Sequence, residues 1–310
     1  MGRFGVGQGL RRVEDLRFLT GEGQYSDDIR LEGQCHGVLV RSPFAHAAIK
    51  SIDLADAKAA PGVLGVFTVD DLDADKVGNI PCLVPMPGKN GRKIVMPPRP
   101  ALARGRVRFV GDGVAFVVAE TLQQARDAAE LVMVDYDPLP AVTDTATAAQ
   151  PGQPQVWDEA PDNISLVWEA GDEAGTRAAF DKAAHVTKLE FVNNRVVVNS
   201  MEPRAAIGDY DKASETFTLY TGSQGSHRFL MPLCERVFGI PKEKMHVITP
   251  DVGGGFGMKI FVYPETVLVL FAARRLGRPV RWNAERSEAF LSDTQGRDHV
   301  TLAELALDKD

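Results

Sequence analysis

The segment that most restricts the fold of this chain is the glycine-rich run at residues 251–259, Asp-Val-Gly-Gly-Gly-Phe-Gly-Met-Lys, here called the glycine loop. Glycines fill four of the five positions from 253 to 257. An apolar run at 246–249 predicts a strand before the loop, and the pattern at 262–275 predicts a helix after it. Glycine tolerates positive φ and lets a ligand approach main-chain N–H groups. The sequence therefore predicts a tight loop whose N–H groups can face an anion such as phosphate.

The common phosphate-binding motifs do not match the glycine loop. A P-loop ends in Gly-Lys-Ser/Thr, whereas Lys259 lies between Met258 and Ile260. The dinucleotide fingerprint Gly-x-Gly-x-x-Gly fails because Met258 takes the place of its third glycine. A phosphate cradle does not require the ring of Phe256, and a ring held there would suit the wall of an adjacent pocket. Two interpretations are open at this point: a ligand-binding loop and a tight turn without a ligand.

A second polar segment, Gly-Ser-Gln-Gly-Ser-His at 222–227, lies between a predicted strand and a predicted helix. Strand ends that meet helix starts often carry ligand contacts. Gln224 can donate and accept hydrogen bonds at once, and His227 is by type a proton carrier or metal ligand. The alternative is a helix-capping turn in which Ser226 is the N-cap and His227 faces solvent.

No metal site or activated nucleophile is recognisable from residue spacing. The six histidines include no HExxH pair, and no Gly-x-Ser-x-Gly elbow occurs. The three cysteines, Cys35, Cys82 and Cys234, have no zinc or iron–sulfur spacing, and we interpret them as buried or incidental thiols in a reducing compartment. Glu202 stands two residues before Arg204, which favours a structural ion pair over a general base.

Length and charge limit the class of protein. The 310 residues suffice for about two domains, and 44% hydrophobic with 25% charged residues is typical of a globular protein. The net charge of −7 argues against a nucleic-acid or anionic-membrane surface. No run approaches the roughly 18 apolar residues of a membrane span, and the amino-terminal stretch lacks the apolar core of a secretion signal. We expect a cytoplasmic protein with no membrane span and no nucleic-acid partner.

The order of predicted elements indicates an α+β chain. Residues 1–140, which open with an extended arm at 1–30, predict a first α/β domain; residues 141–160 predict a linker and 161–310 a second, mixed domain. The individual predictions are strands at 34–41, 47–53, 63–68, 107–110, 114–119, 132–136, 164–169, 185–198, 205–209, 216–220, 280–282 and 300–307, helices at 53–60, 122–131, 171–184 and 229–238, a turn at 69–72 and a long loop at 73–103. Thr121 is the predicted N-cap of the helix at 122–131, and Gly277 is the predicted cap after the helix at 262–275.

Three segments in this order, at 222–227, 251–259 and 278–288, resemble the molybdenum-cofactor-binding large subunit of the xanthine dehydrogenase, aldehyde oxidase and aerobic carbon monoxide dehydrogenase family. The first half agrees with the α/β hammerhead domain of that family, in segments at 12–15, 19–21, 40–47, 110–112 and 134–136. Tyr-Pro-Glu at 263–265 resembles the carbon monoxide dehydrogenase-like and bacterial aldehyde dehydrogenase branch. The resemblance implies an amino-terminal hammerhead domain followed by the first part of a mixed α/β molybdopterin-binding domain.

The resemblance also implies a molybdenum hydroxylase that oxidises a small aldehyde, an N-heterocycle or carbon monoxide. Its cofactor would be molybdenum–molybdopterin, with the cytosine dinucleotide form as one option, and no side chain would ligate the metal directly. By motif match, Gln224 hydrogen-bonds an oxo group on molybdenum, and Gly254, Gly255, Phe256 and Gly257 form the cofactor-binding loop. The N–H groups of the last three hold the cofactor, and the Phe256 ring also walls the substrate pocket. Electrons would pass to 2Fe-2S clusters and FAD on an iron–sulfur subunit and an FAD subunit, in a dimer of heteromeric units.

The chain differs from the family in that it lacks a residue matching the general-base glutamate. The general-base glutamate of the family is expected beyond residue 310, and neither Glu202 nor Glu265 matches its motif, so no catalytic residue is assigned in this chain. Three explanations are open: a fragment, one half of a large subunit completed by a second molybdopterin-binding chain, and a remnant with a binding or assembly role. The fragment is favoured because residues 308–310 resemble the start of a turn.

Three hypotheses of function follow. The first is a molybdenum hydroxylase large subunit or its amino-terminal half, which alone is expected to be inactive. The second is a non-catalytic fragment, scaffold or assembly subunit without the base. The third, a nucleotide-binding α/β protein, is disfavoured by the failed fingerprints.

Overall fold

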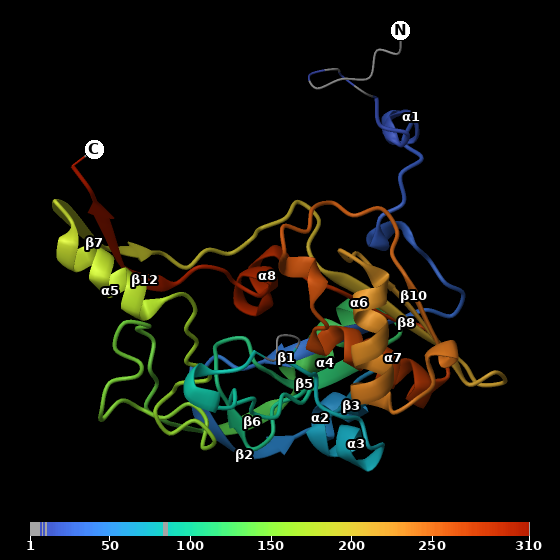
Figure 1. Ribbon diagram of the computed structural model, residues 1–310. Helices are drawn as coiled ribbons and strands as arrows, with labels where there is room; N and C mark the ends of the chain where they lie inside the picture. The colour runs from blue at the N-terminus through green and yellow to red at the C-terminus, as the bar shows by residue number, and fades with distance from the viewer. Residues whose placement is uncertain (1–6, 8, 10, 83–85, 310) are drawn as a thin grey trace, which may run out of the picture.

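The computed structural model describes residues 7, 9, 11–82 and 86–309 and is built around a seven-stranded mixed sheet (Figure 1). In spatial order the strands are β10 (Met245–Ile248), β9 (Thr216–Thr221), β8 (Ala205–Asp211), β11 (Val280–Asn283), β1 (Cys35–Arg41), β5 (Gly113–Ala119) and β3 (Val63–Phe67). The pairs β1–β11 and β9–β10 are parallel, and the other neighbours are antiparallel. Since β1 and β11 come from opposite ends of the chain, this sheet joins both halves of the sequence. The division at 141–160 stays a prediction.

Helix α7 (Pro264–Leu276) is the centre of the hydrophobic core. Its residues from 265 to 273 are all buried, as expected for a helix enclosed by other elements. It packs against β8 and β11, and its Phe271 ring meets Phe67 of β3 edge to face, with centroids 5.3 Å apart. Gly277 ends the helix in the left-handed conformation. The predicted helix at 262–275 and its glycine cap are therefore confirmed.

A smaller sheet lies below the first in the view of Figure 1. It consists of β4 (Arg106–Val107), β2 (Ala47–Asp53) and β6 (Met133–Pro138), with β2 in the middle. Helices α2 (Ala55–Ala59) and α4 (Leu122–Glu130) pack against each other, and α4 covers β1 and β5. Thr121 caps α4, because its hydroxyl accepts the Gln124 N–H at 3.2 Å. This cap was predicted from the sequence and is confirmed.

A two-stranded antiparallel ribbon extends to the left of Figure 1. It is formed by β7 (His185–Asn193) and β12 (His299–Leu307), and α5 (Glu173–Lys182) lies beside it. Every residue of β7 is exposed, and the exposed apolar side chains of the ribbon include Leu189, Phe191, Leu302 and Leu305. An isolated two-stranded ribbon has little stability of its own. The stabilising core therefore lies in the seven-stranded sheet and α7.

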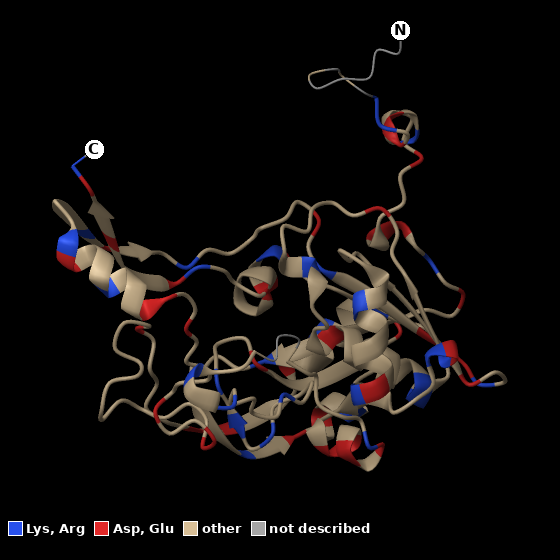
Figure 2. Ribbon diagram, in the orientation of Figure 1, with Lys and Arg blue, Asp and Glu red and all other residues tan. Residues whose placement is uncertain are grey.

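The remaining elements are short. They are α1 (Asp15–Leu19), η1 (Ser26–Asp28), α3 (Val69–Ala74), η2 (Lys89–Gly91), α6 (Ser226–Met231), the π-helical η3 (Pro232–Phe238), η4 (Lys242–Lys244), η5 (Met258–Ile260) and α8 (Arg286–Ser292). In the view of Figure 2, acidic and basic residues are mixed over the visible elements. Within the described ranges, no helix combines the length and the apolar character that a bilayer crossing requires.

Several local predictions are wrong. The arm expected to be extended contains α1, and the strand expected at 185–198 ends at Asn193. The segment at 69–72 is helical as part of α3, not a turn, because Thr68 and Asp71 form a capping box in which the Thr68 N–H reaches the Asp71 carboxylate at 2.9 Å. The strand expected at 107–110 is limited to β4, since the chain turns at Gly111 with a φ of 103°. No strand occupies 164–169; carbonyls of this segment instead accept N–H groups from the long loop at 89 and 95.

The buried carboxyl group of Asp112 is expected to make the stability of the fold depend on pH. Its carboxylate accepts the Arg108 N–H at 3.1 Å in the turn before β5, and burial raises the pKa of Asp112 to about 6. Because the folded pKa lies above the unfolded value, the stabilising effect of protonation is present at low pH and is lost as the pH rises through about 6. We expect Asp112→Asn to raise the free energy of unfolding by about 1–3 kcal/mol at pH 7.5 and by close to zero at pH 4.

Denaturant unfolding at both pH values measures this effect. The control is Asp211→Asn: the Asp211 side chain accepts the N–H groups of Ala213 and Ser214, which lowers its pKa, so this variant should be less stable than the wild type at neutral pH. Equal stability of Asp112→Asn and the wild type at pH 7.5 would contradict the account of Asp112.

Candidate functional site

The glycine loop joins β10 to η5 and α7, as the strand and helix patterns predicted. Its shape depends on three residues with positive φ: Gly254 at 101°, Phe256 at 51° and Gly257 at 89°. The Met258 N–H donates to the Gly255 carbonyl at 2.9 Å and closes a turn around Phe256. A non-glycine residue in this region of φ is uncommon and is maintained by its surroundings. The turn leaves the Phe256 ring 78% exposed.

Gln224, between β9 and α6, lies directly against the glycine loop. Its main-chain N–H donates to the Lys259 carbonyl at 2.9 Å, and its side-chain Oε1 accepts the Gly257 N–H at 2.8 Å. A Cβ atom added to Gly255 would lie 2.5 Å from the Gln224 Cγ. The two polar segments singled out from the sequence thus form one site, and Gly255 is required by the close approach of Gln224.

The hydrogen bond from the Gly257 N–H orients the side-chain amide of Gln224. With Oε1 held by Gly257, the Nε2 group is the part that remains to donate. The resemblance placed the Gly257 N–H among the cofactor donors, but in the structure it already donates to Gln224. The N–H groups of Gly254, Gly255 and Phe256 have no acceptor among the described residues.

The amino-terminal arm holds the first residue of the loop. Arg17 of α1 forms a two-pronged ion pair with Asp251, in which Nη2 lies 2.6 Å from Oδ1. Hydrogen bonding from Arg17 lowers the pKa of Asp251. The Asp251 N–H also donates to the Gln24 carbonyl at 2.8 Å, and Tyr25 forms a parallel bridge with Asp251. The sequence predicted an arm here but no contact with the loop.

Glu202 is a structural ion-pair residue, as predicted, but its partner is Lys259 and not the neighbouring Arg204. The Lys259 Nζ lies 2.9 Å from Oε2 of Glu202 and 2.8 Å from its main-chain oxygen. The Lys259 side chain is 1% exposed. Glu202 Oε2 also accepts the Gly253 N–H at 2.8 Å. No sequence pattern indicated this pair, because its members are 57 positions apart.

Behind the loop, the buried Arg204 and the partly buried Arg41 share one buried carboxylate. Arg41 Nη2 lies 2.6 Å from Oε1 of Glu265, and Arg204 Nη1 lies 2.7 Å from its Oε2. Arg204 also binds Asp293, and Arg41 binds Glu288. Burial opposes ionisation of Glu265, but the two arginines outweigh it and lower the pKa of Glu265 to about 2.

This arginine network reaches the loop through Tyr263. The Arg204 guanidinium lies 3.8 Å from the centre of the Tyr263 ring. The Tyr263 hydroxyl donates to the Met258 carbonyl at 3.0 Å. The end of the glycine loop is therefore attached to the most buried ion pairs of the described structure.

Ser226 is not the N-cap that the sequence suggested, whereas the His227 side chain is exposed, as the capping-turn alternative expected. Gly225, not Ser226, is the N-cap of α6, and no side chain caps this helix. His227 lines a surface groove of about 420 Å³ with Cys82 and Glu235. Among the described residues no group of three or more histidine, cysteine, aspartate or glutamate side chains is arranged to hold a metal ion.

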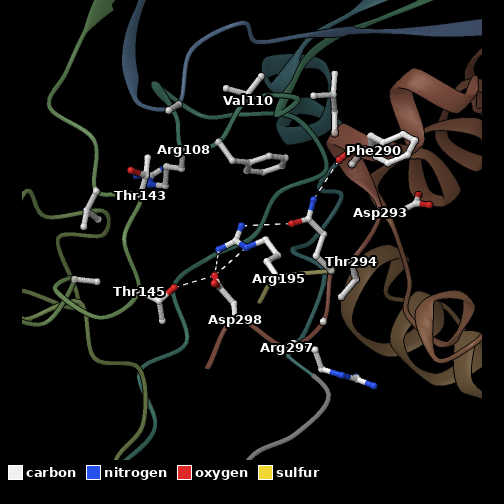
Figure 3. A pocket seen from close by; sticks show the side chains of 18 of the residues that line it. Arg108, Val110, Thr143, Thr145, Arg195, Phe290, Asp293, Thr294, Arg297 and Asp298 are labelled. Carbon is white, nitrogen blue, oxygen red and sulfur yellow. Dashed lines mark hydrogen bonds and ion pairs between the residues drawn. The ribbon is translucent and has the colours of Figure 1, made fainter. Parts of the chain in front are cut away.

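A cavity of about 850 Å³ lies apart from the glycine loop (Figure 3). Arg195 stands near its middle and binds Asp298, which also accepts the Thr145 hydroxyl at 2.8 Å. Its other walls come from residues 108–110 and 290–297. Neither Gln224 nor the glycine loop lines this cavity. A search for the site by cavity size alone would therefore have pointed away from the glycine loop.

The residues present fit an oxygen-rich cofactor at the glycine loop. Among the residues that the structure describes, the fit rests on three N–H groups without acceptors, the free Nε2 of Gln224, and glycine at a position where a Cβ atom would meet that side chain. Such a set of donors suits anionic or oxo oxygens.

Comparison with protein families gives the class. Residues 156–310 match the molybdopterin cofactor-binding domain, and residues 20–140 match the a/b hammerhead domain of aldehyde oxidase and xanthine dehydrogenase. The chain belongs to the aldehyde oxidase and xanthine dehydrogenase family of molybdenum-dependent oxidoreductases. The expected family and the α+β fold, with a hammerhead domain followed by a molybdopterin-binding domain, are confirmed.

Individual proteins of known function and known structure are similar to this chain over almost its whole length. The chain is 37% identical to the carbon monoxide dehydrogenase large chain of Afipia carboxidovorans, over 99% of this chain and 38% of that protein. It is 35% identical to the nicotine 6-hydroxylase large subunit of Paenarthrobacter nicotinovorans, over 97% of this chain and 36% of that protein. The solved structure of reconstituted CO dehydrogenase from Oligotropha carboxidovorans matches with a TM-score of 0.88 and 37% identity, over 98% of this chain and 38% of that one. The chain thus spans less than two fifths of these relatives.

Proposed function

We propose that this chain forms the hammerhead and cofactor-loop part of a molybdenum hydroxylase large subunit. The observation that carries the proposal is the hydrogen bond between Gln224 Oε1 and the Gly257 N–H at 2.8 Å. It places a side-chain donor, Nε2, beside three N–H groups of a glycine loop. When bound, a molybdenum–molybdopterin cofactor supplies the oxidation–reduction chemistry. The cytosine dinucleotide form is part of this proposal.

The residues of the chain would bind and orient the reacting groups. Gln224 Nε2 would donate to an oxygen of the cofactor, and a fixed donor of this kind is most effective where negative charge develops. The N–H groups of Gly254, Gly255 and Phe256 would hold the cofactor from the loop side. Phe256, whose ring is 78% exposed, would wall the space for substrate. Glu202 is engaged by Lys259 and Gly253, so the general base is proposed to lie in sequence beyond residue 310.

Substrate class and partners are proposed from the relatives. The relatives include a carbon monoxide dehydrogenase and a nicotine 6-hydroxylase, whose names point to a small gas and to an N-heterocycle as substrates. We propose a small aldehyde, an N-heterocycle or carbon monoxide as substrate. Partner subunits with 2Fe-2S clusters and FAD would accept the electrons, in a cytoplasmic dimer of heteromeric units.

Anaerobic spectroscopy of the complex purified through this chain tests the proposal. Each substrate class is added in turn, and the bleaching of the flavin and iron–sulfur absorbance bands is followed. We expect one class to bleach the bands as fully as dithionite does. If dithionite bleaches them and no member of the three classes does, the hydroxylase proposal is wrong. A non-catalytic scaffold, which the structural use of Glu202 favours, would then take its place.

Phe256→Ala tests the assignment of the pocket wall. Alanine is as restricted at positive φ as phenylalanine, so the main change is loss of the ring. We expect the ratio of kcat/KM between a small and a bulky substrate to change by about tenfold or more, with molybdenum per copy unchanged. Phe290→Ala removes another exposed ring, 47% exposed on α8, and serves as the control without an effect on that ratio. Loss of the cofactor in Phe256→Ala would contradict the role as pocket wall.

A further inference from the structure

We propose that Glu202 and Lys259 act together as positioning residues, which fix the glycine loop and the Gln224 amide for the cofactor. This inference rests on the function proposed above. Neither side chain points its polar atoms at the cofactor-binding N–H groups; each acts through the main chain that carries them.

Lys259 is a buried cation with two acceptors on one residue. Its side chain is 1% exposed, and its ammonium donates to the main-chain oxygen and to Oε2 of Glu202. Burial of an ammonium group is costly unless its protons are hydrogen-bonded and its charge is paired. Glu202 meets both needs, so the position of Lys259, the last residue of the glycine loop, is determined by Glu202.

Glu202 also holds the beginning of the same loop. Its Oε2 accepts the Gly253 N–H at 2.8 Å, and its own N–H donates to the Gly253 carbonyl at 3.1 Å. A Cβ atom on Gly253 would lie 2.5 Å from the Cβ of Glu202. One residue thus holds the loop at two places, at Gly253 near its beginning and at Lys259 at its end.

The pair reaches Gln224 through the main chain of Lys259. The Lys259 carbonyl accepts the Gln224 N–H at 2.9 Å, and Gln224 Oε1 in turn accepts the Gly257 N–H at 2.8 Å. A shift of Lys259 therefore moves the residue that carries the proposed cofactor donor. Displacement of a positioned group by about 1 Å can reduce a rate about 100-fold, so this pair should affect kcat more than binding of substrate.

The double variant Glu202→Gln with Lys259→Met separates positioning from folding. It removes both charges, so neither is left buried alone, and it keeps a carbonyl oxygen near Gly253. In the purified complex we expect kcat to fall about 10- to 100-fold with KM within about twofold. Molybdenum per copy should stay close to the wild-type value. Hydrogen exchange of the peptide that contains residues 251–259 should be about tenfold faster or more.

The matched control removes an exposed ion pair remote in sequence from the loop. Arg278 and Glu120 bind each other with side chains 32% and 45% exposed. The double variant Glu120→Gln with Arg278→Met should retain the wild-type kcat and the wild-type exchange of the loop.

The outcomes distinguish this inference from the proposed function. Wild-type kcat and wild-type loop exchange in the Glu202→Gln/Lys259→Met complex overturn the positioning role and leave the proposed function standing. A wild-type complex without molybdenum overturns both. If the double variant does not assemble, Gly253→Ala is the second test, because its Cβ would displace the loop from Glu202 without removing a charge. The same fall in kcat at constant KM is expected, and wild-type values overturn the inference.

Discussion

Gly255→Ala is expected to reduce kcat of the assembled complex about 100-fold and to lower its molybdenum content. The added Cβ would lie 2.5 Å from Cγ and 2.6 Å from Cδ of Gln224. The Gln224 side chain cannot turn away without loss of the hydrogen bond that its Oε1 accepts from the Gly257 N–H at 2.8 Å. Gly255 is not among the glycines with positive φ, so alanine is compatible with its backbone. The clash with the Gln224 side chain, which supplies the three atoms nearest to the added Cβ, is therefore the expected local cause of the effect.

The control and the readouts make this prediction specific. Gly296→Ala adds a Cβ that would meet nothing within 4 Å, and it should leave rate and molybdenum content unchanged. Molybdenum is measured per copy of this chain, and kcat is measured with the best substrate. A Gly255→Ala complex with wild-type rate and full cofactor would show that Gln224 does not contact the cofactor from this position.

Arg204→Met is expected to produce the largest loss of stability, about 3–5 kcal/mol. The Arg204 side chain is buried, with 6% exposed, and its guanidinium pairs with Glu265 and Asp293. Methionine fills part of the space but leaves both carboxylates with one fewer cation. Arg177→Met is the control, because its i,i+4 pair with Glu173 is exposed and such pairs contribute only about 0.3–0.5 kcal/mol. A loss below about 1 kcal/mol for Arg204→Met would contradict the account of the network.

The same network is expected to make the free energy of unfolding depend on pH in the acid range. The pKa of Glu265 is lowered to about 2 by the arginines despite its burial. A lowered carboxyl pKa contributes stability that is complete above the unfolded value, about 4.3, and is lost as the pH falls through the folded value. Denaturant unfolding of the wild type should therefore show a fall in stability between about pH 4.3 and pH 2. Arg204→Met should lose less over this range, because its Glu265 starts with a higher pKa.

Sequence patterns correctly predicted the helix ends whose structure depends on neighbouring residues. Thr121 caps α4 and Gly277 ends α7 as predicted, because caps depend on residues within one turn. The same rules failed at 69–72, where the Thr68–Asp71 capping box was not recognised, and at 164–169, where a strand-like pattern has no ladder partner. Both errors concern short segments whose structure depends on a few contacts.

The site was only partly predictable for a physical reason. Gln224 and the glycine loop were singled out separately, and their approach was implied by the family resemblance, not by spacing. The contacts that hold them come from distant parts of the chain: Arg17 with Asp251 across 234 positions and Lys259 with Glu202 across 57. A single sequence carries no local signal for such pairs. Likewise, the parallel pairing of β1 with β11 could not be read from the order of the strands.

The central claim, that this chain holds a molybdenum cofactor at the glycine loop, is tested most directly by molybdenum analysis. The complex is purified through this chain from cells whose other molybdoenzymes are loaded, and molybdenum is expressed per copy of the chain. We predict close to one molybdenum atom per copy, which would mean that the complex supplies the rest of the cofactor site. The absence of molybdenum from such a preparation would contradict the claim and leave the chain as a fragment or scaffold.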